Sequence, residues 1–311
     1  IKSIFSYFVK TKFTTVKQAD LTRLASLAKA DLMTQMVFEF PSLQGKMGSV
    51  YATQSKESKL IATAIYEQYL PAGKDSLLPQ TQAGIALALA DRLDSLITLF
   101  GNGAKPTGSQ DPLGLRRAAN GVFSILFNHQ LAFDCQSFIN QFADPSNKNT
   151  QRLIDFLDQR IHTFLVDQTL SYDIAESIRH LAWKDIHHAY DCGQAISTFK
   201  SQSPQNFKLI VDTALRVKRL GTKANGAALS STYFEQPIET DLLHSLQALT
   251  KKSASLTLTD LTTFSTQLTA YFDTILVMAD DINCRNNRLQ FLAQCHQLYM
   301  TYANFEAIVD A

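Results

Sequence analysis

The spacing of apolar residues most constrains the fold, because it follows the period of an α-helix along nearly the whole chain. The segment from Asp20 to Phe40 is apolar on nearly every side, which predicts a central buried helix that Pro41 ends. Gln82 to Phe100 carries a broad apolar stripe, which predicts a long helix that ends near Gly101 and Gly103. No segment shows a convincing strand pattern. We therefore predict an all-α protein.

Composition agrees with a folded chain that buries a core. Of the 311 residues, 45% are hydrophobic and 18% charged, which argues against disorder. The formal net charge of +1 excludes a broad basic surface but permits local basic patches. No apolar run reaches the ~18 residues of a membrane span. The four cysteines form no C-x-x-C pair, which predicts free thiols in a reducing cytosol.

Proline, glycine and polar clusters divide the chain into shorter elements. A short helix is expected from Lys59 to Tyr69, and Asp111 is expected to cap a helix whose first residue is Pro112. Further helices are expected near 150–166, 173–182, 184–200, 205–220, 239–252 and 259–300, with a break in the last near Asp280–Asp281. We predict a first domain over 1–145, a helical linker region over 146–205 and a last domain over 206–311.

Three carboxylates of the first domain are candidates for a structural or a metal-binding role. Asp91 lies on a stripe of small residues that includes Gly84 and Ser95, with Asp94 beside it, and Asp31 lies on the preceding buried segment. A carboxylate on such a seam needs a partner, since an unpaired buried charge is costly. We expect Asp31 and Asp91 to be ion-paired inside a helical scaffold. A metal-dependent phosphohydrolase is the alternative, although no histidine precedes His129.

Local groups of basic and amide side chains are the candidates for RNA contact. Arginine suits phosphate and asparagine suits base edges. The candidates in the last domain are Arg285, Asn286, Asn287 and Arg288, with Arg216, Lys218 and Arg219. Those in the first are Lys46, Lys105, Arg116 and Arg117. Structural interpretations stay open: an Asp281–Arg285 pair, a favourable helix-end charge near Arg219, and pairing of Arg116 or Arg117 with Asp91 or Asp94.

Three ordered segments of the sequence are similar to one known family. LAKADLMTQMVFEFPSLQGKMGSVYA (Leu27–Ala52) and ALALADRLDSLITLFGNGAKPTGSQDPLGLRRAANGV (Ala86–Val122) resemble two characteristic blocks of the glycyl-tRNA synthetase β subunit. AYFDTILVMADDINCRNNRLQFL (Ala270–Leu292) resembles the C-terminal signature of that family. Between the second and third blocks the likeness rests on pattern and length, with RVKR (Arg216–Arg219) as the best local match.

The resemblance implies a fold, a role and partners. The first domain is expected to be a degenerate HD-like helical domain that lacks the metal-ligand histidines. The last is expected to be a helical anticodon-binding domain similar to that of arginyl-tRNA synthetases. The family forms an α2β2 assembly whose α subunit binds ATP and Mg²⁺ and makes glycyl-adenylate, while the β subunit binds tRNA-Gly. Because family chains are longer and this one begins at Ile1, we expect a fragment without catalytic residues, metal or cofactor of its own.

The sequence thus predicts the tRNA-recognition part of a glycine–tRNA ligase, a cytoplasmic enzyme of a bacterium or a plastid, with no membrane association. Two alternatives remain from the residues themselves. One is the phosphohydrolase that would use Asp31, Asp91 and Asp94, and the other is a scaffold that binds only protein.

Overall fold

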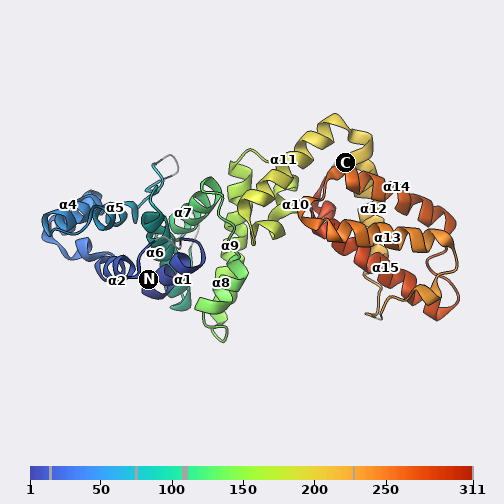
Figure 1. Ribbon diagram of the computed structural model, residues 1–311, viewed down its shortest axis with the longest axis horizontal. Helices are drawn as coiled ribbons and strands as arrows, with labels where there is room; N and C mark the ends of the chain where they lie inside the picture. Colours follow the sequence, from blue (N-terminus) through green and yellow to red (C-terminus); the bar gives the residue numbers. More distant parts are fainter. Residues whose placement is uncertain (14–15, 74–75, 107–110, 227, 310–311) are drawn as a thin grey trace. The chain divides into compact units, whose positions relative to one another are not determined.

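The computed structural model describes residues 1–13, 16–73, 76–106, 111–226 and 228–309. Within these ranges the chain forms helices and short 3-10 turns and no strand, which confirms the predicted all-α class (Figure 1). The α-helices are α1 (Lys2–Thr11), α2 (Gln18–Leu27), α3 (Gln35–Glu39), α4 (Lys46–Gln54), α5 (Lys59–Glu67), α6 (Gln82–Gly101), α7 (Leu115–Asn128), α8 (Cys135–Phe142), α9 (Lys148–Asp167), α10 (Tyr172–Ala182), α11 (Ile186–Gln202), α12 (Pro204–Gly221), α13 (Pro237–Lys251), α14 (Leu258–Thr274) and α15 (Ile282–Met300). The 3-10 turns are η1 (Ala30–Met33), η2 (Pro41–Leu43), η3 (Ser231–Tyr233), η4 (Ser253–Ser255) and η5 (Phe305–Ala307).

The chain divides into two compact units. Unit 1 comprises Ile1–Phe164 with Trp183–His187, and unit 2 comprises Leu165–Ala182 with His188–Ala311. The predicted linker region over 146–205 contributes residues to both units, and the three-part division stays a prediction. Within the described residues no helix is both long and apolar enough to cross a membrane. All four cysteines are free and buried, as the sequence predicts.

Helix α6 is the centre of unit 1 and packs against α1, α5 and α7. Every residue of α6 from 83 to 91 is buried. Gly84 faces Glu67 of α5 so closely that a Cβ atom would collide with its carboxylate. The small residues predicted along one side of α6 therefore admit a neighbouring helix, as expected.

Elsewhere in the same unit Trp183 donates a hydrogen bond from Nε1 to Oδ1 of Asp158 at 2.8 Å.

The buried carboxylate of Glu67 holds the start of α6. It accepts hydrogen bonds from the backbone amides of Gln80, at 2.9 Å, and Thr81, at 3.1 Å, and from the Thr81 hydroxyl. The Thr81 hydroxyl in turn caps α6 by accepting from the Gly84 amide at 3.1 Å. A negative charge at a helix N-terminus is favourable. The hydrogen bonds of the buried Glu67 thus fix both the loop before α6 and the contact between α6 and α5.

Unit 2 is built around α12, α14 and α15. Helix α12 packs against both of the others, and α13 packs against α14 and α15. Gly221 lies so close to α15 that an added Cβ would stand 2.9 Å from the Ala293 backbone. The hydroxyls of Ser265 and Tyr299, both buried, are 2.7 Å apart and join α14 to α15. The predicted break in the last helix is confirmed, since α14 ends at Thr274 and α15 begins at Ile282.

The predicted continuous helix from Asp20 to Phe40 is wrong. The chain turns at Lys29, whose φ of 62° is left-handed, and forms η1 and then α3. Side chains replace helical bonding here: the Thr34 hydroxyl donates to the Asp31 carbonyl at 2.7 Å and caps α3 at Val37. Several of its apolar residues are also not buried, since Met33 is 89% and Phe38 79% exposed.

The predicted start of the next helix is also wrong. Helix α7 begins at Leu115, after Gly114 in the left-handed conformation, rather than at Pro112. Asp111 still serves this helix start, because its Oδ2 accepts from the backbone amides of Arg116 and Arg117 at 3.1 and 3.3 Å. The sequence correctly associated Asp111 with the N-terminus of this helix but placed it too close to the first helical residue.

Candidate nucleic-acid interface

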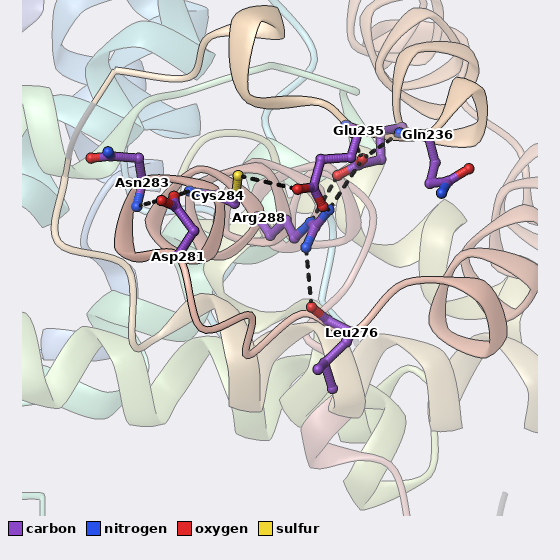
Figure 2. Close-up of polar contacts among 8 residues, drawn as sticks. Glu235, Gln236, Leu276, Asp281, Asn283, Cys284 and Arg288 are labelled. Carbon is purple, nitrogen blue, oxygen red and sulfur yellow. Dashed lines mark hydrogen bonds and ion pairs between the residues drawn. The ribbon is translucent and has the colours of Figure 1, made fainter.

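The start of α15 is organised by a buried arginine. Arg288, which is 3% exposed, donates from Nε to Oε1 of Glu239 at 2.9 Å and from Nη2 to Oε2 of Glu235 at 2.6 Å. Its Nη1 donates to the carbonyl of Leu276 at 3.2 Å. Figure 2 shows Arg288 reaching from α15 toward Glu235 on one side and Leu276 on the other. We call these four residues the Arg288 cluster.

The carboxylates of the cluster compensate the charge of Arg288 within the fold. Burial alone would lower the pKa of Arg288, but its hydrogen bonds to Glu239 and Glu235 outweigh burial and raise that pKa above its ordinary value. Glu239, 1% exposed, also accepts from the backbone amides of Glu235 and Gln236 at the start of α13. The cluster therefore joins three segments: the start of α13, the loop after α14, and α15.

Two neighbours of Arg288 complete the helix start. Asp281 caps α15 by accepting from the amides of Asn283 and Cys284 at 2.9 and 2.8 Å. The Cys284 amide is the main reason that the pKa of Asp281 lies below its ordinary value. Asn287, 3% exposed, accepts from the Ser230 amide at 2.8 Å. The side chains of Asn287 and Arg288 thus form hydrogen bonds inside unit 2. The prediction of direct RNA contact remains for the two residues that precede them.

Those neighbours are Arg285 and Asn286, which are half-exposed on the first turns of α15. Within the described part of the chain the Arg285 side chain has no ion-pair partner, since Asp281 caps the helix instead. The loop before α15 and the first residue of this helix add Leu276, Met278 and Ile282, which are 72%, 45% and 50% exposed. A cation, an amide and apolar side chains on one rigid helix start are the groups that contact unpaired RNA bases and phosphates.

The predicted phosphate contacts on α12 have different surroundings. The guanidinium of Arg216 lies over the Phe272 ring, 4.0 Å from its centroid, and Lys218 forms an ion pair with Glu306. Arg219 is exposed and has no side-chain partner among the described residues. The structure therefore leaves Arg219 available and holds the other two against the fold.

The three carboxylates of unit 1 do not form one site. Asp31 accepts from the Tyr69 hydroxyl at 2.7 Å and the Gly45 amide at 2.6 Å, and Asp91 forms an ion pair with Lys29 at 2.5 Å. Asp94 lies 2.7 Å from the Ile1 amino group. The expected ion pair is present for Asp91, whereas Asp31 is held by neutral donors. Among the described residues no group of three or more His, Cys, Asp or Glu side chains has the geometry to hold a metal ion.

Unit 1 also holds an arginine inside its fold, the half-buried Arg92, at the wall of a cleft of about 540 Å³. Nη1 of Arg92 donates to the carbonyls of Gln68 and Ala88, both at 3.0 Å. Its Nη2 donates to the carbonyls of Tyr69 and Pro71, at 3.2 and 3.0 Å. Burial lowers the pKa of Arg92 to about 10, although Asp91 acts in the opposite direction. We call this space the Arg92 cleft.

The structure brings two of the predicted RNA contacts of unit 1 together at this cleft. Lys46, the first residue of α4, and Arg117, in the first turn of α7, both line it and are both exposed. Arg117 Nε is 3.8 Å from Asp111 rather than paired with Asp91 or Asp94. Lys105 is exposed and Arg116 half-exposed, and neither lines the cleft.

Sequence reasoning missed the residues that hold these arrangements. Glu239 stands three residues after the N-cap Gln236, and the two form a capping box, so that spacing was the available signal for a helix start. Its partnership with Arg288, 49 residues away, has no local signal. Nor does the contact of Arg92 with the turn at Gln68–Pro71.

Comparison with protein-family models gives a match to the first part of the chain. The model described as glycyl-tRNA synthetase beta subunit matches residues 1–180, more than half of the chain.

Curated relatives extend the likeness over most of the sequence. The glycine–tRNA ligase beta subunit of Desulforamulus reducens is 32% identical over 311 residues, which cover 94% of this chain and 44% of the relative. That of Acaryochloris marina is 35% identical over 93% of this chain and 45% of its own length. That of Lactococcus lactis subsp. cremoris is 32% identical over 99% of this chain and 48% of its own. The chain spans just under half the length of these relatives. It belongs to the glycyl-tRNA synthetase beta subunit family.

Proposed function

We propose that this chain is a tRNA-binding part of a glycine–tRNA ligase, and that the start of α15 contacts the RNA. Relatives named glycine–tRNA ligase beta subunit match over nine-tenths of the chain. The observation that carries the proposal is the pair Arg285 and Asn286, half-exposed on a helix start whose buried arginine is compensated by the carboxylates of the Arg288 cluster. A rigid scaffold that presents adaptable polar groups suits recognition.

Within this proposal unit 2 is an anticodon-binding domain and unit 1 a degenerate HD-like domain. The substrate is tRNA-Gly, and the partner is the α subunit, which supplies the ATP and Mg²⁺ chemistry of glycyl-adenylate formation. The enzyme works in the cytoplasm. The chain itself contributes binding and positioning. Arg219, Arg216 and Lys218 are the proposed phosphate contacts beside α15, with Asn287 and Arg288 as supports of its start.

The experiment is a titration of the 311-residue chain with tRNA-Gly and a non-cognate tRNA at several salt concentrations. We expect the double variant Arg285→Ala/Asn286→Ala to weaken tRNA-Gly binding about tenfold or more, because each base or phosphate contact is worth roughly 1–3 kcal/mol. The salt slope should fall by about one, since one phosphate contact is lost. Lys208→Ala, an exposed cation of α12 outside this surface, is the matched control. Unchanged affinity and salt slope in the double variant would contradict the assignment.

A protein-binding scaffold is a second candidate, favoured by one observation. Between residues 32 and 40 five large apolar side chains are exposed: Leu32, Met33, Met36, Phe38 and Phe40. Exposed apolar groups gathered in this way mark interaction sites. The two candidates separate in the same titration, because a scaffold without RNA function binds neither tRNA at low salt.

The phosphohydrolase alternative has no supporting observation in the geometry. Asp31 and Asp91 are engaged by Tyr69, Gly45 and Lys29. Soaking crystals in Mn²⁺ tests it directly, since density between these carboxylates would revive it.

A further inference from the structure

The Arg92 cleft has properties of a ligand site that its packing does not explain. Its volume of about 540 Å³ lies within the roughly 300–1,000 Å³ of small-molecule sites. Four charged side chains line it: Lys46, Arg92 and Arg117 are cations, and Asp91 is the carboxylate. Asp91 is already paired with Lys29, which does not line the cleft. Arg117 lies 3.8 Å from the Asp111 carboxylate, whereas Lys46 and Arg92 form no ion pair among the described residues. These two cations leave the cleft with excess positive charge, which suits an anion.

Arg92 makes that charge a fixed part of the wall. Its four hydrogen bonds all go to neutral carbonyl oxygens, and among the described residues no carboxylate forms an ion pair with it. Carbonyl groups satisfy the donors but carry no net charge, so only Asp91, itself paired with Lys29, opposes the charge of Arg92. Because charges withdrawn from water are normally paired, a ligand anion would complete this wall. Arg92 itself would attract the anion electrostatically, while the exposed Lys46 and Arg117 would contact it.

A buried amide beside this arginine points to more than a simple anion. Gln68 lines the cleft and is 0% exposed, yet neither its Oε1 nor its Nε2 has a hydrogen-bond partner within the described chain. Such a group is rare in native proteins, since each unmade bond is costly. An amide offers one acceptor and two donors, which match the edge of a nucleobase. Tyr66 and Tyr69 also line the cleft, and aromatic residues are a common stacking partner of a base.

We propose that the Arg92 cleft binds one nucleotide, with the phosphate held by Lys46 and Arg117 and the base in the pocket beside Gln68. The nucleotide comes either from an unpaired position of RNA or from a free mononucleotide. This inference rests on the proposed RNA-binding function in its choice of ligand, but its site lies in unit 1, away from α15 in the sequence.

The test is calorimetric titration of the 311-residue chain at low salt with inorganic phosphate, the four nucleoside 5′-monophosphates and a short unstructured oligoribonucleotide. We expect at least one base-bearing probe to bind at least tenfold more tightly than phosphate. Tighter binding of the oligoribonucleotide than of any monophosphate assigns the site to RNA, and equal binding assigns it to a free nucleotide. Phosphate binding as tight as all the others, or no binding by any probe, overturns the proposal.

Variants connect that binding to the cleft. Lys46→Ala/Arg117→Ala should weaken the base-bearing probe about tenfold or more, whereas Lys59→Ala, which removes an equally exposed lysine at the first position of α5, should not change it. Gln68→Met should weaken the base-bearing probe and leave phosphate unchanged, without loss of thermal stability. A Gln68→Met variant with wild-type affinity would contradict the placement of the base. Because these small probes need no contact with α15, the double variant Arg285→Ala/Asn286→Ala should bind them normally, so the two proposals fail separately.

Discussion

Each unit holds an arginine inside its fold, the buried Arg288 in unit 2 and the half-buried Arg92 in unit 1, and the two charges are compensated differently. Arg288 meets the carboxylates of Glu235 and Glu239 and one carbonyl, whereas Arg92 meets four carbonyls. The pKa of Arg288 is accordingly raised by its partners, and that of Arg92 is lowered by burial to about 10. The difference teaches that an arginine inside a fold can have its charge compensated by carboxylates of the protein. Alternatively, it can keep a positive potential that attracts an anionic ligand.

The largest expected effect is the loss of the paired charge. Arg288→Met leaves the buried Glu239 without its cation, and breaking a buried pair in this way costs about 3–5 kcal/mol. Hydrogen exchange of the α15 amides measures the free energy of opening of unit 2. Arg285→Met, which removes an unpaired arginine one turn earlier, should change it by less than about 0.5 kcal/mol. A loss below about 1 kcal/mol in the Arg288 variant would refute the structural role.

Arg92→Met should cost less, about 2 kcal/mol, because it strands no buried carboxylate. Its four carbonyl partners lie at the turn before the cleft and on α6, where water can replace part of the lost bonding. Hydrogen exchange of the α6 amides provides the measurement. If this variant proves as damaging as Arg288→Met, carboxylate compensation is not what separates the two sites.

Gly121→Ala probes the same arginine without removing its charge. A Cβ atom at Gly121 of α7 would collide with the Arg92 guanidinium, so the side chain must shift from its carbonyl partners. Overpacking of this kind costs about 1–3 kcal/mol, offset by a gain in helix propensity of roughly 1 kcal/mol. We expect a net loss of about 1 kcal/mol in thermal unfolding. Gly226→Ala is no control because its φ of 79° is strained, whereas Ser124→Ala on the same helix is suitable.

The smallest effect concerns the acid end of the pH range. The pKa of Asp281 is lowered by the Cys284 amide, so its contribution is present above the unfolded pKa of about 4 and is lost as pH falls through the lower folded value. Asp281→Asn keeps a capping oxygen but cannot titrate. The stability difference between wild type and this variant should therefore shrink as pH falls from about 5 to 2. A difference that is constant with pH would show that the charge of Asp281 contributes nothing.

Periodicity predicted the helices well where burial and local signals agree. The long apolar stripe of α6 and the break before α15 were predicted correctly, because both depend on residues close in sequence. The segment from Asp20 to Phe40 failed, since its course depends on Asp31 meeting Gly45 and Tyr69. The candidate site followed the same division. Residue type made Arg285, Arg117 and Arg288 equal candidates, and only the fold separates Arg288, whose partners lie about 50 residues away.

The hydrogen bond between Trp183 and Asp158 has a spectroscopic consequence. Trp183 is the one tryptophan of the sequence, and both partners belong to unit 1. Intrinsic indole fluorescence, excited apart from tyrosine, therefore reports on that unit alone, while circular dichroism sums the helices of both. If the two signals change at different denaturant concentrations, the units unfold independently. The fluorescence of Trp183 then shows whether the substitution of an arginine has destabilised unit 1 or unit 2.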